Sequence, residues 1–82
     1  MKINKRFGDE IYVKWIDAYT DSNWGSVEDA LEIDRCSLCY TKGWYIGQKK
    51  GFLIIAHTIG NTRKDNIMGK VYIPVKWVKE LK

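Results

Sequence analysis

Apolar residues follow a strand-like pattern through much of this chain, and the longest apolar run is residues 51–59. The run reads Gly-Phe-Leu-Ile-Ile-Ala-His-Thr-Ile, and Gly60-Asn61 follows it. β-Branched and aromatic residues dominate it, and turn formers bound it, which at this length favours a strand over a helix. Both of its faces are apolar. We therefore expect the central strand of a small barrel or tight sandwich, buried on both sides.

The first strand is predicted over residues 11–16, where successive side chains alternate between two faces. Ile11, Val13 and Trp15 share one face, and we expect Trp15 to enter the core. The opposite face consists of Tyr12, Lys14 and Ile16.

A long acidic loop is predicted after this strand, because residues 17–26 are rich in turn formers and have no periodicity. Ser26, followed three residues later by Asp29, is typical of a capping box at the start of a helix. We therefore expect one short helix in the loop. Its apolar side would consist of Val27, Ala30 and Leu31.

Further strands are predicted from similar signals. Residues 36–41 form the second strand, Lys42-Gly43 a tight connection, and residues 44–48 the third strand. Lys49-Lys50-Gly51 is then a hairpin turn into the apolar run.

The C-terminal third contains a polar loop and two more extended segments. Residues 60–69 have little apolar pattern and are predicted to be a mobile loop. Residues 70–73 form a strand that the only proline, Pro74, closes. Apolar residues at intervals of three in residues 75–81 predict a 3₁₀ turn followed by a short pairing segment. The whole pattern predicts an all-β fold of about five strands.

Length and composition agree with one small folded domain. The 82 residues leave room for a single domain, residues 1–82, with residues 1–9 as a flexible N-terminus. A hydrophobic share of 45% and an aromatic share of 13% exclude intrinsic disorder. No stretch approaches the roughly 18 apolar residues of a membrane span, and no apolar region follows the basic N-terminal residues. We expect a soluble protein of the cytoplasm, with too few cysteines for a disulfide framework.

The net charge of +4 conceals a segregation of charge along the chain. Residues 9–34 contain eight acidic residues and one basic residue, whereas residues 35–82 contain ten basic and two acidic residues. Two interpretations stay open. The opposite charges neutralise each other across strands, or they form a bipolar surface that steers a charged partner.

The residue patterns argue against catalysis. Cys36 and Cys39 have the spacing of a redox or zinc half-site, but in a strand this spacing points their side chains to opposite faces. A structural zinc ion would also need a second pair of ligands. His57, the only histidine, is interpreted as a core residue or as a hydrogen-bonding residue at the mouth of the barrel. We expect no enzyme, no catalytic residue, no cofactor and no metal ion.

Three stretches resemble the SH3-like small barrels. Residues 15–19 lie where that family has Ala-Leu-Tyr-Asp-Tyr, and Trp44-Tyr45 stand for the paired aromatics after the n-Src loop. Residues 73–78, Ile-Pro-Val-Lys-Trp-Val, resemble Ile-Pro-Ser-Asn-Tyr-Val, with Trp77 in place of the tyrosine. The resemblance covers most of residues 11–81 as an order of elements, and it implies an SH3-like barrel.

A second resemblance concerns the biological setting. The spacing Trp-x-Asp-Ala…Trp…Glu-Asp, with Ile-Pro-x-x-x-Val near the end, is similar to small uncharacterised proteins of bacteriophages and prophages. This resemblance implies a viral protein that acts in the cytoplasm of a bacterial host cell. A role against host antiviral defence would fit that setting.

Binding is therefore the leading class of function, and three versions of it stay open. In the first, a nucleotide-derived small molecule is sequestered in an aromatic cleft that basic loop residues close. In the second, the acidic loop docks on a host protein as an inhibitor or adaptor. In the third, the basic half binds nucleic acid. A homo-oligomer would suit so thin a core. The predicted ligand-binding residues are Tyr19, Asp21, Trp24, Trp44, Arg63, Lys64 and Trp77.

Overall fold

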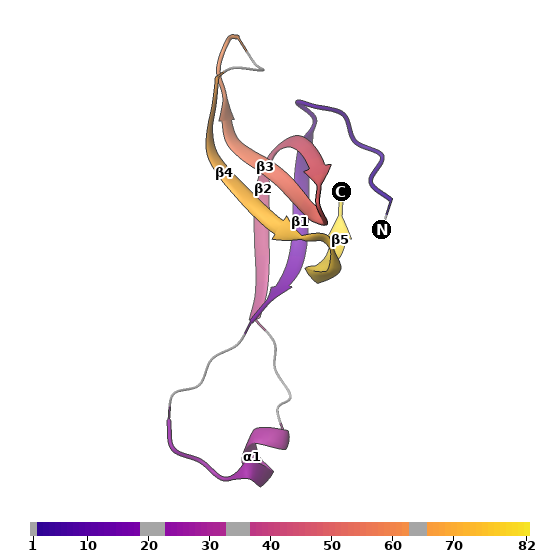
Figure 1. Ribbon diagram of the computed structural model, residues 1–82. Helices are drawn as coiled ribbons and strands as arrows, with labels where there is room; N and C mark the ends of the chain where they lie inside the picture. Colours follow the sequence, from indigo (N-terminus) through magenta and orange to yellow (C-terminus); the bar gives the residue numbers. More distant parts are fainter. Residues whose placement is uncertain (1, 19–22, 33–36, 63–65) are drawn as a thin grey trace.

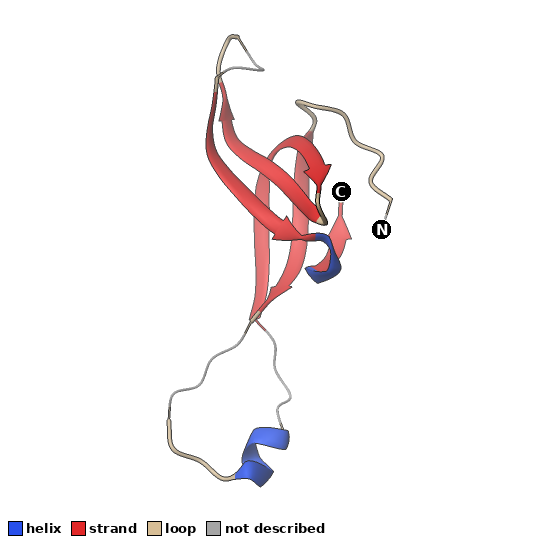
Figure 2. Ribbon diagram, in the orientation of Figure 1, coloured by secondary structure: helices blue, strands red, loops and turns tan. Residues whose placement is uncertain are grey.

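A single antiparallel sheet dominates the computed structural model, which describes residues 2–18, 23–32, 37–62 and 66–82 (Figures 1 and 2). The sheet order is β4-β3-β2-β1-β5. Its elements are β1 (Glu10–Asp17), α1 (Val27–Leu31), β2 (Ser37–Lys49), β3 (Phe52–Ile59), β4 (Ile67–Pro74), the 3₁₀ turn η1 (Val75–Trp77) and β5 (Val78–Leu81). The predicted all-β class is confirmed, as are the helix after the first strand and the 3₁₀ turn before the last.

β2 is the central strand of the sheet and joins its two halves. Its first part, Ser37–Trp44, pairs with β1, and its second part, Trp44–Lys49, pairs with β3. A register shift between Tyr45 and Gly47 accompanies the bend of β2, after which β3 and β4 run across the direction of β1 in Figure 1. The prediction that the apolar run is the central strand is wrong, because β3 lies between β2 and β4.

Gly43 lies inside β2, so the connection predicted at Lys42-Gly43 is also wrong. The residue is buried, and its partner across the ladder is Ile11. A Cβ atom at this position would lie 2.5 Å from Cγ2 of Ile55 and 2.7 Å from the carbonyl oxygen of Ala56. The glycine therefore permits the close approach of β3, and it does not form a turn.

The hairpin turn between β2 and β3 is confirmed. Lys49 and Phe52 face each other across the ladder, and the two residues between them have positive φ angles, 54° for Lys50 and 80° for Gly51. Such angles at both central residues are typical of a type I′ turn, which matches the twist of the flanking strands. The backbone N–H of Val75 donates to the carbonyl of Gly51 at 2.8 Å, which fixes η1 against this turn.

The hydrophobic core lies on the inner side of the bent sheet and is small. As predicted, Ile11 and Val13 point into it, while Trp15 is half-buried and packs against it. Ile3 also packs against it from the segment before β1. The fully or nearly fully buried members are Ile11, Val13, Tyr45, Leu53, Ile55 and Ile73.

β3 is buried on both sides only in its middle. Ala56 is the last residue of β3 that pairs with β2, so the hairpin of β3 and β4 continues beyond it without a third strand alongside. His57 lies in this continuation and is exposed, with its Nδ1 atom 3.2 Å from Oγ1 of Thr58. The interpretation of His57 as a core residue is therefore wrong, and its hydrogen bond lies at the surface.

The loop after β1 contains the predicted capping box. The Oγ atom of Ser26 accepts a hydrogen bond from the backbone N–H of Asp29 at 3.0 Å, and α1 begins at the next residue after Ser26. Figure 1 shows α1 beyond the end of β1 and β2, away from the rest of the sheet. Among the described residues, no helix is long and apolar enough to cross a membrane. We call residues 23–32 the arm.

The hairpin of β3 and β4 is longer than predicted. β4 begins at Ile67, inside the predicted loop, and its ladder with β3 extends to the pair of Ile59 and Ile67. The N–H of Gly60 donates to the carbonyl of Asn66 at 2.6 Å and closes the end of the ladder. The 3₁₀ turn and short pairing segment predicted for residues 75–81 are confirmed as η1 and β5.

Candidate ligand-binding face of the sheet

Of the predicted ligand-binding residues, the structure describes Trp24, Trp44 and Trp77, and it does not bring these three together. Trp24 lies in the arm and is fully exposed, with a relative exposure of 102%. Trp44 faces Glu10 at the start of β1, whereas Trp77 precedes Val78, which pairs with Trp15 near the end of β1. These three aromatic side chains therefore do not share one cleft. The other predicted residues, Tyr19, Asp21, Arg63 and Lys64, lie outside the described residues.

Trp77 instead belongs to a pair of stacked rings. Its ring centroid lies 6.3 Å from that of Trp15, with an interplanar angle of 12°. The Nε1–H group of Trp15 donates to Oγ1 of Thr41 on β2 at 3.0 Å. Stacking and this hydrogen bond connect η1, β1 and β2. Lys76 and Lys79 flank Trp77 in an open pocket of about 320 Å³.

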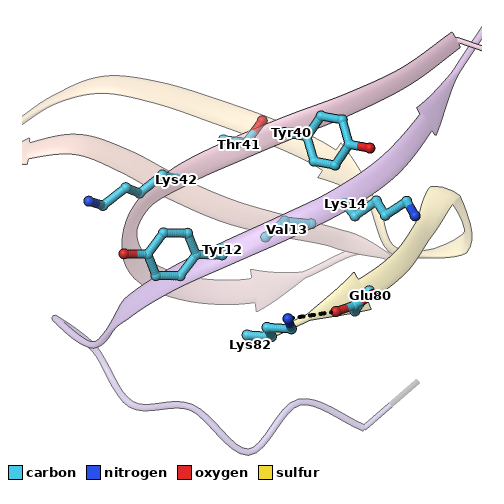
Figure 3. A pocket seen from close by; sticks show the side chains of 8 residues that line it. All are labelled: Tyr12, Val13, Lys14, Tyr40, Thr41, Lys42, Glu80 and Lys82. Carbon is cyan, nitrogen blue, oxygen red and sulfur yellow. Dashed lines mark ion pairs between the residues drawn. The ribbon is translucent and has the colours of Figure 1, made fainter.

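A second open pocket, also of about 320 Å³, lies on the outer face of β2, β1 and β5 (Figure 3). Alternation along β1 sends Ile11 and Val13 into the core, so Tyr12 and Lys14 point outward. In the ladder with β2, the outward tyrosine of β1 lies opposite a lysine, and the outward lysine lies opposite a tyrosine. Tyr12 pairs with Lys42, and Lys14 pairs with Tyr40.

β5 adds a third column to this face. Reciprocal backbone hydrogen bonds at 3.1 and 2.9 Å place Lys82 beside Tyr12, and Glu80 pairs with Lys14. One row across the strands is therefore Lys-Tyr-Lys, and the next is Tyr-Lys-Glu. We call Tyr12, Lys14, Tyr40, Lys42 and Lys82 the ligand face.

Lys42 is held in place by two neighbours. Its Nζ atom lies 5.2 Å from the centre of the Tyr12 ring and 3.9 Å from Oε2 of Glu10. The hydroxyl of Tyr12 in turn donates to Oε1 of Glu10 at 3.3 Å. The hydrogen bond with Tyr12 and then the charge of Glu10 raise the pKa of Lys42 above its ordinary value of 10.5. Lys42 is therefore a positive charge beside an exposed ring.

The two other lysines of the face differ in their surroundings. Lys82 forms an ion pair with Glu80, with Nζ and Oε1 3.2 Å apart. Within the part of the chain that the structure describes, Lys14 has no carboxylate within ion-pair distance. Lys14 faces Tyr40 on β2 and Glu80 on β5, and it follows Tyr12 on the same side of β1. Since it forms no ion pair with a described carboxylate, it is available to an anionic group.

The pKa of Lys42 offers a direct test of this arrangement. We expect Tyr12→Phe to lower that pKa, because it removes the largest contribution and keeps the ring, and Glu10→Gln to lower it by less. NMR titration of the side-chain signals of Lys42 measures both. Glu80→Gln is the control, since this carboxylate pairs with Lys82, and should leave the pKa of Lys42 unchanged. An unchanged pKa in Tyr12→Phe would contradict the contact.

The described residues contain no group of three or more His, Cys, Asp or Glu side chains that could hold a metal ion. Cys39 is half-buried, with its Sγ atom 3.8 Å from the carbonyl oxygen of Ser37. Cys36 lies outside the described residues, so the predicted opposite orientation of the two thiols stays a prediction.

The ligand face was not predicted, although part of its signal is present in the sequence. The alternation of residues 11–16 places Tyr12 and Lys14 on the polar side of a strand. Their partners Tyr40 and Lys42 follow the same alternation on β2. What sequence alone lacks is the register that puts each tyrosine opposite a lysine.

Comparison with protein-family models, with curated proteins and with solved structures finds no match to this chain.

Proposed function

We propose that this protein is a non-enzymatic binding protein, and that its ligand face holds a nucleotide-derived small molecule. The observation that carries the proposal is the alternation of tyrosine and lysine across β2, β1 and β5. Tyr40 is 74% exposed and Tyr12 48%, so both rings are accessible to a ligand. Their faces can stack on a base, and neighbouring lysines can hold phosphate oxygens.

The size and charge of the pocket support the same class of ligand. Its volume of about 320 Å³ is near the lower end of the range for small-molecule sites. Lys14 forms no ion pair with a described carboxylate, and Lys42 is charged at neutral pH, since its pKa lies above the ordinary lysine value of 10.5. A compact anion with one planar ring matches these features.

The sheet order supports an SH3-like barrel as the finer description of the fold. The longest connection follows β1, a two-residue turn joins β2 to β3, and a 3₁₀ turn precedes the last strand. The long connection after the first strand and the 3₁₀ turn before the last are the ones that the sequence resemblance implies, whereas Trp44 and Tyr45 lie inside β2 and follow no loop. The role in a bacteriophage, in the cytoplasm of a bacterial host and against its antiviral defence, rests on sequence resemblance and belongs to the same proposal.

Single-stranded nucleic acid is a second candidate ligand, and the openness of the face favours it. Three strands present the tyrosines and lysines without a wall around them, as expected for a surface on which successive bases stack. Glu10 and Glu80 beside the face weaken this candidate, because they would repel a continuous phosphate backbone.

Isothermal titration with single nucleotides and with a short oligonucleotide tests the proposal. We expect nucleotide binding that changes little between about 50 and 200 mM salt, whereas oligonucleotide binding would weaken steeply over that range. Lys14→Ser should weaken nucleotide binding by about tenfold, because a hydrogen bond to a charged group is lost.

Lys79→Ser is the matched control, because Lys79 is an exposed lysine of β5 outside the ligand face. The nucleotide affinity of this variant should equal that of the wild type. Equal losses in the two variants, or no heat with any nucleotide, would contradict the proposed site. A steep salt dependence with the oligonucleotide alone would replace the small ligand with nucleic acid.

A further inference from the structure

The arm carries apolar side chains that nothing in the described chain covers. Trp24, Val27 and Leu31 are 102%, 76% and 80% exposed, and no residue of α1 is buried. Val27 and Leu31 are four residues apart and share one side of α1. The arm also contains three acidic residues and no basic residue. They are Glu28, Asp29 and Glu32. The surface of the arm thus combines exposed apolar side chains with charges that are all negative.

The outer face of β3 and β4 has the complementary character. Met68 and Tyr72 are 68% and 56% exposed, and Phe52 is 40% exposed. In the ladders, Lys49 lies opposite Phe52, and Lys70 lies opposite Ala56, so both lysines belong to this outer face. Neither β3 nor β4 contains an acidic residue. We call Lys49, Phe52, Met68, Lys70 and Tyr72 the docking face.

We propose that the arm of one chain docks on the docking face of a second copy, and that the exchange is reciprocal. Exposed apolar side chains meet exposed apolar side chains, and the acidic residues of the arm meet Lys49 and Lys70. A contact of this kind, repeated by a twofold axis, closes a dimer. Aromatic anchors such as Trp24 supply most of the affinity, and the charges select the partner surface.

The shape of the chain favours a second copy over the chain's own docking face. The molecule measures 54 × 24 × 21 Å, and α1 and the far end of the β3–β4 hairpin lie at opposite ends in Figure 1. An arm that extends in this way reaches a neighbour without bending back. Two reciprocal contacts also double the buried area, which helps to reach the roughly 800 Å² per partner of a stable interface. The ligand face lies on β2, β1 and β5 and stays free.

Charge reversal distinguishes this arrangement from other dimers. One variant carries Glu28→Lys and Glu32→Lys in the arm, and the other carries Lys49→Glu and Lys70→Glu in the docking face. In each variant alone, arm and docking face have the same sign, and we expect the dimer dissociation constant to rise by more than about tenfold. An equimolar mixture pairs opposite signs at both contacts, so we expect a heterodimer.

Native mass spectrometry reads out the result, because the wild-type dimer has twice the chain mass of 9.6 kDa. Lys79→Glu reverses an exposed lysine outside the docking face and should leave the dimer intact. All substituted positions are exposed, and circular dichroism confirms that the variants fold. A monomeric wild type, a dimer that persists in either reversed variant, or a mixture without heterodimer would each overturn the proposal.

Discussion

Replacing Leu53 with alanine is expected to lower the free energy of unfolding by about 2 to 5 kcal/mol. The Leu53 side chain is fully buried in the inner cluster of the sheet, next to Ile11, Ile55 and Ile73. Removing it loses transfer free energy and leaves a cavity that its neighbours fill only in part. A domain of 82 residues has a total stability of about 4 to 12 kcal/mol, so the loss is a large share.

Urea unfolding followed by tryptophan fluorescence measures this effect. Leu38→Ala is the matched control, because it removes the same atoms from a side chain of β2 that is 42% exposed and lies outside the arm and the docking face. We expect a much smaller loss of stability in that variant. A comparable loss in both variants would mean that Leu53 does not lie in the core.

Replacing Gly43 with alanine has the second largest expected effect on stability. The new Cβ atom would lie 2.5 Å from Ile55 Cγ2 and 2.7 Å from the carbonyl oxygen of Ala56. The side chain of Ile55 can rotate, but the carbonyl belongs to the backbone of β3, so β2 and β3 would have to separate. We expect a loss of about 1 to 3 kcal/mol, measured by the same urea unfolding.

Gly47→Ala is the control for this substitution, because it lies in the same strand and its Cβ atom would have nothing within 4 Å. We expect its stability to stay within about 0.5 kcal/mol of the wild type. If Gly43→Ala were as stable as Gly47→Ala, the close approach of β2 and β3 at this point would be refuted.

The elements that were predicted well depend on local signals. Alternation places Ile11 and Val13 on the buried side of β1, and the capping residue Ser26 places the start of α1 at the next residue. The hairpin at Lys50-Gly51 requires positive φ angles, which a Lys-Gly pair can adopt. Each of these features is decided by residues within a few positions of one another.

The elements that were predicted wrongly depend on contacts across the chain. The sequence predicts a turn at Gly43, yet the glycine is required by Ile55 and Ala56 of β3, which lie more than ten residues further along the chain. One of the two interpretations of His57 places it in the core because its strand is apolar, but the pairing between β2 and β3 ends at Ala56. The local sequence does not show at which residue the pairing of one strand with its neighbour ends.

The candidate site shows the same division. The predicted site gathered aromatic residues by type, and the structure separates Trp24, Trp44 and Trp77. The ligand face instead gathers residues by register, since Tyr12 and Lys42 face each other across two strands. Alternation was enough to identify the outward side of β1, but the pairing of tyrosine with lysine required the ladder.

The ligand face and the core depend on the same strands. Ile11 and Val13 anchor β1 in the core. Because side chains alternate along the strand, this anchoring points Tyr12 and Lys14 outward. The stack of Trp15 on Trp77 and the hydrogen bond to Thr41 hold β1, β2 and η1 together at the far end. A rigid support of this kind suits a binding surface, because little ordering remains to be done when a ligand arrives.

An NMR titration of the labelled protein with a mixture of nucleotides, followed through the backbone amide signals, shows directly where a nucleotide binds. We expect saturable shifts at Tyr12, Lys14, Tyr40, Lys42 and Lys82 and much smaller shifts at Met68 and Tyr72 on the docking face. Saturable shifts centred on residues 76–79 or on the arm, or no shifts at all, would contradict the assignment of the ligand face.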